Sequence, residues 1–189
     1  MLALSAGTEQ APAILEQLSD VHRAISDVLH AMPNGQPFSA VQIAAIADFR
    51  QAVEREFGAE FDDIDWALAD IADESVRALS PLAREVFFGA AREAIRNAAR
   101  HGRGRDADRP LRLRLSLAAA DALTLRIEDD GVGLDAPPDD DHAAGAGQGM
   151  ALHGAMMAII GGAWLTEHTA HGMRITLSLL PEVAIGGPP

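Results

Sequence analysis

The chain has 189 residues, with a hydrophobic share of 48% and a charged share of 23%, which are ordinary values for one soluble globular domain with an appendage. Its 28 acidic and 15 basic residues give a net charge of −13, which argues against a nucleic-acid partner bound through bulk charge. The absence of cysteine excludes disulfide scaffolds, thiolate zinc sites and thiol nucleophiles.

No membrane segment is predicted. No stretch approaches the roughly 18 consecutive apolar residues of a spanning helix, and the first residues lack the basic and apolar pattern of a signal peptide. We therefore expect a cytoplasmic chain, either by itself or as a piece of a membrane-anchored parent protein.

The N-terminal part predicts two helices. Between residues 11 and 32, apolar residues recur at steps of three and four, which indicates an amphipathic helix that Pro33 and the following turn residues end. A second helix is expected from Ser39, as its N-cap, to Phe57.

The rest of the chain predicts alternating strands and helices. Ser80 followed by Pro81 is a strong helix start. The expected elements are a strand (61–71), a helix (81–100), two strands of an antiparallel hairpin (111–117 and 123–128), a loop (131–149), a helix (150–160) and two last strands (163–168 and 173–180). This order predicts an α+β fold, a two-layer α/β sandwich with one mixed, mostly antiparallel sheet and helices on one face.

One polar stripe of the predicted helix 81–100 carries chemistry. At about 100° per residue, Glu93, Asn97, Arg100 and His101 fall within about a 100° arc. A carboxylate beside a carboxamide suits Mg²⁺, and arginine with histidine suits phosphate oxygens. A solvated helix face is the alternative interpretation of this stripe.

The end of the second hairpin strand carries an acidic residue on an apolar face. Alternation places Asp129 with Leu125 and Ile127, toward the core, where a carboxylate needs a donor such as the exocyclic amine of a purine. Gly131 and Gly133 would let a flat ligand approach the backbone. A simple Asp-Gly turn explains the same residues equally well.

A third group consists of the glycines before the helix at residue 150. Glycine-rich backbone at a helix N-terminus can bind anions, and the glycines are Gly145, Gly147 and Gly149. No lysine follows them, which excludes a Walker A loop. A flexible loop is the alternative.

Together, in this order and spacing, the three groups resemble the N, G1 and G2 boxes of the ATP-binding fold shared by gyrase, heat-shock chaperones, histidine kinases and MutL, the Bergerat fold. The match covers about residues 60–181, and Glu93 to Gly102 looks like the N box of a histidine kinase. The loop 134–144 would be the ATP lid. It is short and acidic and lacks phenylalanine, which is similar to the nitrate-sensor and lipid-thermosensor class of kinases.

The resemblance implies a role for each residue. Asn97 would bind Mg²⁺, with Glu93 orienting a metal-bound water or assisting proton transfer. Asp129 would accept a hydrogen bond from the adenine amine. The other expected nucleotide-binding residues are Arg100, His101, Gly131, Gly133, Gly145, Gly147, Gly149 and Met150. Two positions depart from the family pattern: Met173 stands where threonine is common, and Gln148 where leucine is common.

The function implied is that of a protein histidine kinase: binding of Mg-ATP and transfer of the γ-phosphoryl group to a phosphoacceptor histidine in two-component signalling. In the families that this chain resembles, an acidic residue usually follows the phosphoacceptor histidine. The candidates His22 and His30 are not followed by one, so the acceptor is expected elsewhere in a parent chain or in a separate protein. The implied partners are a phosphoacceptor and dimerisation domain, a response regulator and a second copy of the chain in a homodimer. The implied domains are an N-terminal helical segment (1–58), the catalytic domain (59–181) and a tail (182–189).

Two other functions remain open from the sequence. One is a serine kinase similar to anti-sigma factors, which shares the boxes but does not need the helices at 11–57. The other is a non-catalytic interaction module with a degenerate pocket, a reading to which Met173 and the acidic lid lend weight.

Overall fold

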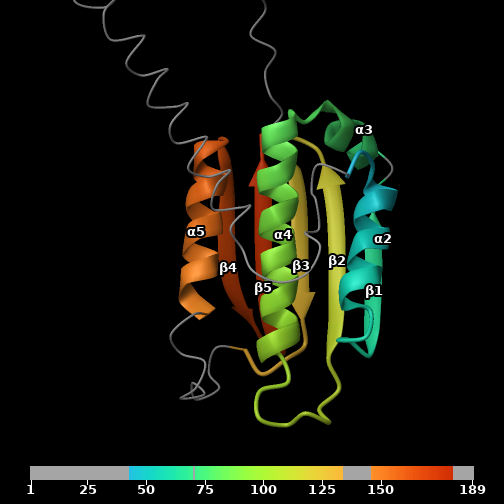
Figure 1. The fold of residues 1–189 in the computed structure, drawn as a ribbon, viewed down its shortest axis with the longest axis vertical. Coiled ribbons are helices and arrows are strands. Elements are labelled where there is room, and N and C mark those ends of the chain that lie inside the picture. Colours follow the sequence, from blue (N-terminus) through green and yellow to red (C-terminus); the bar gives the residue numbers. More distant parts are fainter. Residues whose placement is uncertain (1–42, 70, 134–145, 181–189) are drawn as a thin grey trace, which may run out of the picture. The chain divides into compact units, whose positions relative to one another are not determined.

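The computed structural model describes residues 43–69, 71–133 and 146–180, which all belong to one compact unit of the chain, residues 38–189 (Figure 1). Several predictions lie outside the described residues: the helix over 11–32, the cap at Ser39, the lid over 134–144, Gly145 and the tail. Among the described residues, no helix is both long and apolar enough to cross a membrane.

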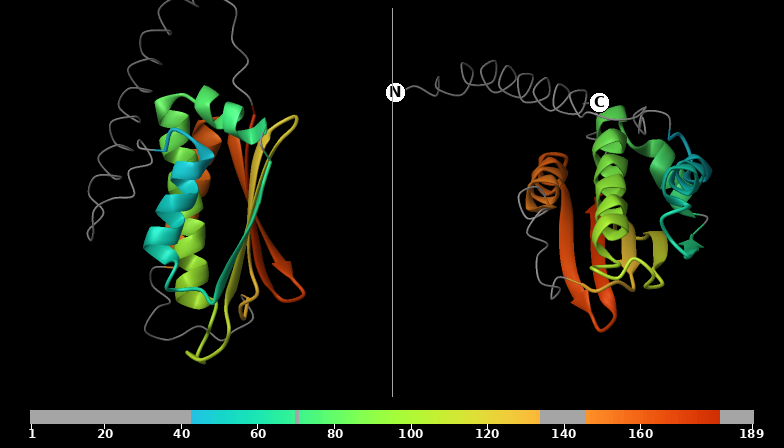
Figure 2. Two further views of the ribbon diagram at one scale, coloured as in Figure 1. Left: turned by 90° about the vertical axis from the view of Figure 1, so that its right-hand side faces the viewer. Right: turned by 60° about the horizontal axis from the view of Figure 1, so that its bottom comes forward.

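Four helices and five strands make up the described part. They are α2 (Ile46–Phe57), β1 (Asp63–Leu68), α3 (Ile71–Ala78), α4 (Pro81–His101), β2 (Arg112–Ala119), β3 (Leu123–Asp129), α5 (Ala146–Ile159), β4 (Gly162–Thr169) and β5 (Gly172–Leu179). The sheet order is β1-β2-β3-β5-β4, with β1 parallel to β2 and all other pairs antiparallel. The helices cover one face of this sheet (Figures 1 and 2). The predicted two-layer α+β fold is confirmed.

The core lies between the sheet and α4, the central helix. Residues of β2 and β3 alternate between buried and outward positions as the pattern predicts, with the leucines on the buried side, where Leu113, Leu115 and Leu125 are fully buried. Phe87 and Ile95 of α4 are also fully buried. This packing fixes how α4 lies along the sheet, and with it the direction of its polar stripe.

The start of α4 follows the prediction. Ser80 accepts a hydrogen bond from the backbone N–H of Ala83 at 3.2 Å, and Pro81 occupies the first helical position. The helix runs to His101 and is closed by Gly102, whose N–H donates to the carbonyl of Ala98.

Three predicted boundaries are wrong. The second helix begins at Ile46 rather than Ser39, because the Asp48 carboxylate accepts from the backbone N–H groups of Ala44 and Ala45 and caps the helix there. The strand predicted for 61–71 ends at Leu68, and the eight-residue helix α3 that follows was not predicted. The helix expected from Met150 begins four residues earlier, at Ala146, so Gly147 and Gly149 are helical.

Candidate functional site

The polar stripe of α4 holds a fixed carboxylate. Glu93 and Asn97 are half-buried, whereas Arg100 and His101 are exposed. Glu93 Oε2 accepts from Arg96 Nη1 at 2.9 Å, and its Oε1 accepts from Asn97 Nδ2 at 3.4 Å. Because the Asn97 amide nitrogen faces Glu93, its Oδ1 is the atom that can serve a cation.

The beginning of α5 lies against the same carboxylate. A Cβ placed on Gly149 would overlap Glu93 Oε1 and lie 3.1 Å from Glu93 Cδ. The fold thus brings Gly149, the third glycine of the predicted phosphate loop, to Glu93, the predicted catalytic glutamate, which lies 56 residues earlier in the chain. Gly147 and Met150 lie in the first turns of the same helix. A side chain at 149 would displace the end of the Glu93 side chain from this position.

Asp129 ends β3 on the core side, as predicted. Its register partner on β5 is Met173, and its Oδ1 accepts from the backbone N–H of Gly131 at 3.0 Å. Burial raises the pKa of the Asp129 carboxyl, while the backbone N–H groups of Gly131 and Met173 act in the opposite direction and nearby Asp130 adds to the rise. This half-buried carboxylate is a hydrogen-bond acceptor set among backbone groups.

The turn after Asp129 is fastened to the end of α4. A Cβ on Gly131 would lie 2.5 Å from both the Cα and the carbonyl oxygen of Gly102, and Val132 N–H donates to that oxygen at 2.8 Å. Gly133 has φ of +67°, which favours glycine. A Cβ there would lie 3.8 Å from His168 Nδ1.

Helix α4 and the residue that follows it therefore contact the other two predicted groups. Glu93 meets Gly149 near the middle of α4, and Gly102, just past its C-terminus, meets Gly131. The prediction of Gly145 as part of this site lies outside the described residues.

Two side chains near Glu93 were not predicted. Arg96 pairs with it, and His153 of α5 is only 4% exposed, beside Gly89 of α4. Burial lowers the pKa of His153; Glu93 acts in the opposite direction, and Arg96 lowers it further. His153 Nδ1 is buried without a hydrogen-bond partner in the described part of the chain. The one available signal was a histidine within an α5 sequence that is otherwise uncharged.

The donor set suits a nucleotide-bound magnesium ion better than a protein-held metal. The described residues contain no group of three or more His, Cys, Asp or Glu side chains that could hold a metal. Mg²⁺ in nucleotide sites commonly keeps its waters and takes one or two protein oxygens besides phosphate oxygens. Glu93 and Asn97 can supply such oxygens.

Comparisons with known proteins concern the family and the fold. The family model described as "Histidine kinase-like ATPase domain" matches residues 36–179. No curated protein matches the chain.

Solved structures of histidine kinases share the fold. The histidine kinase domain of the blue-light activated histidine kinase EL346 from Erythrobacter litoralis aligns with a TM-score of 0.55 at 16% identity, over 78% of this chain and 66% of that one. A second structure of EL346 gives a TM-score of 0.53 at 14% identity, over 73% of this chain and 42% of that one. The histidine kinase AdeS from Acinetobacter baumannii gives 0.52 at 14% identity, over 95% and 87%.

This chain thus spans about two thirds and two fifths of the length of the two EL346 structures, and the likeness to all three concerns the fold. The family itself is shown by the family model, which covers most of the chain and all three groups of predicted site residues. The chain belongs to the histidine kinase-like ATPase domain family.

Proposed function

We propose that this chain binds Mg-ATP and is the catalytic part of a protein histidine kinase in cytoplasmic two-component signalling. The observation that carries the proposal is the approach of Gly149 to Glu93, which joins a helix N-terminus to a fixed carboxylate and an amide oxygen. ATP would supply the transferable phosphoryl group and Mg²⁺ the neutralisation of its charge.

Each residue of the site has a task in this proposal. Asp129 accepts from the adenine amine, and Gly131 and Gly133 let the ring lie against the backbone. Asn97 holds Mg²⁺ through Oδ1, and Glu93 orients a water or takes the proton of the attacking group. The phosphates lie at the start of α5 near Gly145, Gly147, Gly149 and Met150, with Arg100 and His101 beside them.

The phosphoacceptor is proposed to lie on a dimerisation domain, either in a parent chain or in a separate protein, and the final acceptor on a response regulator. Residues 1–58 would be a helical segment that contains the end of the dimerisation helix and a helix connecting it to the catalytic domain, residues 59–181. The last helix of this segment, α2, packs on α4: the rings of Phe49 and Phe88 lie 4.8 Å apart. A movement of α2 would therefore be transmitted to α4, the helix that carries Glu93.

Calorimetric titration with Mg-ATP tests the nucleotide site. We expect saturable binding by the wild-type chain and none by Asp129→Asn. The asparagine has an N–H₂ group in place of one carboxylate oxygen, and this donor cannot accept a hydrogen bond from the adenine amine or from the backbone N–H groups. Melting curves of both proteins serve as the control for folding. Absence of binding at millimolar nucleotide would favour the interaction module.

A labelled-phosphate chase identifies the acceptor residue. After incubation with ATP and the candidate phosphoacceptor domain, the label on histidine is lost in acid, whereas the label on serine is retained. Acid-stable label would contradict the histidine kinase assignment and favour the serine kinase. Glu93→Gln should bind nucleotide but transfer no label, and Arg126→Met, an exposed residue on the far face of β3, should behave as wild type.

A further inference from the structure

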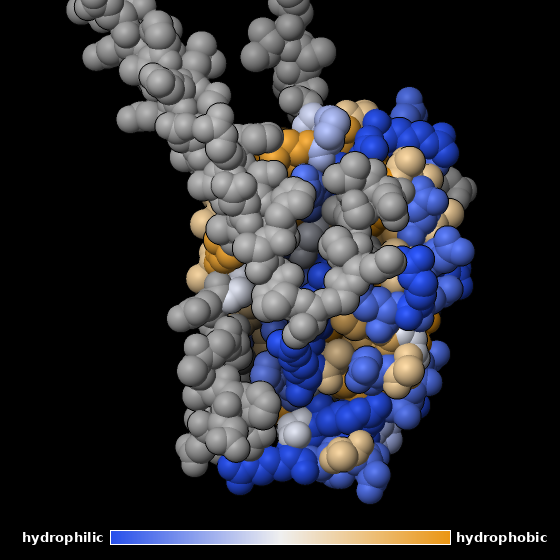
Figure 3. Space-filling model, in the orientation of Figure 1, coloured by the Kyte–Doolittle hydropathy of each residue, from blue (hydrophilic) through white to orange (hydrophobic). Residues whose placement is uncertain are grey.

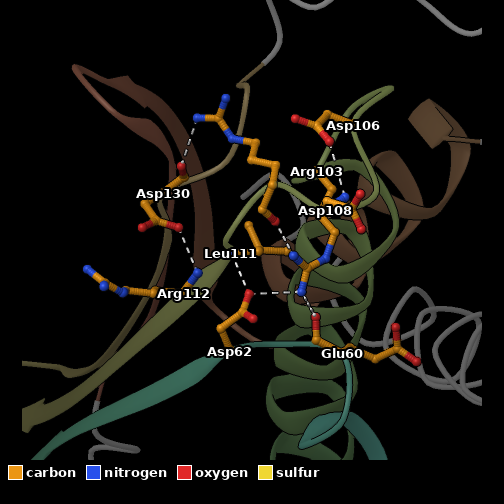
Figure 4. Close-up of polar contacts among 9 residues, drawn as sticks. Glu60, Asp62, Arg103, Asp106, Asp108, Leu111, Arg112 and Asp130 are labelled. Carbon is orange, nitrogen blue, oxygen red and sulfur yellow. Dashed lines mark hydrogen bonds and ion pairs between the residues drawn. The ribbon is translucent and has the colours of Figure 1, made fainter.

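The loop after α4 joins distant parts of the chain through an arginine (Figure 4). Arg103 Nη2 donates to Asp62 Oδ2 at 3.0 Å and to the carbonyl oxygen of Glu60 at 3.2 Å, just before β1. Arg103 Nη1 donates to the backbone carbonyl oxygen of Arg109. Arg103 therefore ties the backbone at Arg109 to the segment that precedes β1.

Asp62 is itself held in place. Its backbone N–H donates to the carbonyl oxygen of Leu111 at 2.9 Å, and its Oδ2 accepts from the Leu111 N–H at 2.8 Å. The Leu111 N–H and the Arg103 guanidinium lower the pKa of the Asp62 carboxyl, so it is ionised at neutral pH. Figure 3 shows that hydrophilic residues gather at the lower end of the molecule, where Figure 1 places this loop.

The side chain of Arg109 reaches the turn after β3. Its Nη2 donates to the carbonyl oxygen of Asp130 at 3.4 Å. That oxygen belongs to the same peptide group as the Gly131 N–H, which donates to Asp129 Oδ1 at 3.0 Å. Because a peptide group is planar, a contact at one end restrains the other. Arg109 and Asp129 thus hold one peptide group from its two ends.

The adjoining residue restrains the same turn. The Arg112 N–H donates to Asp130 Oδ1 at 2.6 Å, and the Asp130 N–H donates to the Arg112 carbonyl oxygen at 3.3 Å. Arg109 Nε is buried and has no hydrogen-bond partner among the described residues. Burying an arginine nitrogen without a hydrogen-bond partner is unfavourable for folding. A functional role for Arg109 would explain why an arginine is nevertheless present at this position.

We propose that Arg109 is a positioning residue for adenine recognition, held in place by Asp62 and Arg103. It acts through the Asp130–Gly131 peptide group, which sets the orientation of the Asp129 carboxylate. The inference rests on the proposed function, because it takes Asp129 as the acceptor of the adenine amine. None of these three positioning residues lies in the motifs singled out from the sequence.

Affinities for two nucleotides test this role. Inosine triphosphate carries a carbonyl oxygen where ATP has the amine, so it cannot form the hydrogen bond from that amine to Asp129. We expect Arg109→Met to bind Mg-ATP about tenfold more weakly, as for the loss of one hydrogen bond to a charged group, and to bind Mg-inosine triphosphate as the wild type does. Arg126→Met, the matched control on the exposed face of β3, should leave both affinities unchanged.

A readout without nucleotide covers the case in which Arg109→Met does not fold. In Arg103→Lys, which keeps the charge but cannot bridge Asp62 and the Arg109 carbonyl in the same way, the Gly131 amide should exchange its hydrogen several-fold faster. The amide of Leu177 in the core of β5 should exchange as in the wild type.

The possible outcomes separate the two proposals. Equal weakening for both nucleotides, or unchanged affinity for ATP, overturns the role of Arg109. Unchanged exchange at Gly131 in Arg103→Lys overturns the role of Arg103. Absence of ATP binding by the wild type, or full binding by Asp129→Asn, overturns the proposed nucleotide site and this inference with it.

Discussion

Asp129 is an ionisable group at the centre of the proposed adenine site, so its protonation should govern binding. Burial raises its pKa above the 3.8 of an exposed aspartate. The carboxylate therefore gains a proton at a higher pH than an exposed aspartate does, and the protonated form is a poorer acceptor for an amine. We expect ATP affinity to decrease as the pH falls toward this raised pKa, with the protein still folded.

Titration calorimetry over a series of pH values measures this effect. The midpoint of the decrease should lie above pH 3.8, and inosine triphosphate, whose base lacks the amine that donates to Asp129, should lack this component of the pH dependence. A profile shared by both nucleotides would assign the effect to the phosphates or their neighbours instead.

His153 should limit stability in acid. Burial holds its pKa in the folded protein below the 6.5 of an exposed histidine. As the pH falls below 6.5, the unfolded chain therefore binds a proton at His153 before the folded chain does. Its contribution to stability is complete above pH 6.5 and is lost as the pH falls below that value. We expect His153→Leu to flatten this decrease, because leucine fills the space without a buried nitrogen that lacks a partner.

Denaturant unfolding at several pH values between neutral and about pH 5 tests the role of His153. The difference in free energy of unfolding between His153→Leu and wild type should grow as the pH is lowered. His171→Leu, at an exposed turn position, is the matched control and should follow the wild type. A constant difference across the series would mean that proton uptake at His153 is not responsible.

At the scale of elements, α2 is an integral part of the core that supports α4. Phe49 is fully buried and its ring contacts those of Phe88 and Trp66, at 4.8 and 6.0 Å between centroids. We expect Phe49→Ala to reduce the free energy of unfolding by about 3–5 kcal/mol, as for other buried aromatic truncations. Gln51→Ala, at an exposed position of the same helix, should change it by less than about 0.5 kcal/mol. Equal effects would show that α2 is not packed on the domain.

Elements with strong local signals could be predicted from the sequence. The Ser80–Pro81 start of α4 and the alternation in β2 and β3 depend on neighbouring residues alone, and both are confirmed. The helix α3 has only eight residues, and the spacing of its buried side chains Ala72 and Val76 is too short a pattern to stand out in the sequence. The start of α2 depends on Asp48 and also on Asp73 of α3, which accepts from the Ile46 N–H at 2.9 Å.

The candidate site shows the same division between local and distant information. The residue types and their spacing indicate the three groups, and alternation correctly places Asp129 on the core side. The contact of Gly149 with Glu93 and the reach of Arg109 to Asp130 join residues 56 and 21 positions apart. Such contacts follow from how helices lie on the sheet, which no periodicity within one element specifies.

For the molecule as a whole, opposite electrostatic effects compete. Across the open face of the sheet, one row alternates in charge through all five strands: Asp65, Arg114, Glu128, Arg174 and Glu167. Its pairs differ in exposure: Arg114 and Asp65 lie 3.3 Å apart with about 60% of each side chain accessible, whereas Arg174 and Glu128 are partly buried. Exposed pairs of this kind contribute about 0–1 kcal/mol each, and salt weakens them. By contrast, the net charge of −13 means that repulsion among the excess acidic groups destabilises the folded chain.

We expect the self-repulsion to outweigh the exposed ion pairs, so that salt stabilises the protein. Raising sodium chloride from low concentration to about 0.3 M shortens the screening length well below 10 Å. Near neutral pH, the thermal midpoint should then rise by about 2–4 °C, which corresponds to about 1 kcal/mol in a chain of this size. Near the isoelectric point, at about pH 4.8, the net charge vanishes and the rise should disappear. A thermal midpoint that falls with salt at neutral pH would show that ion pairs, such as those in the row across the sheet, stabilise the protein by more than the repulsion destabilises it.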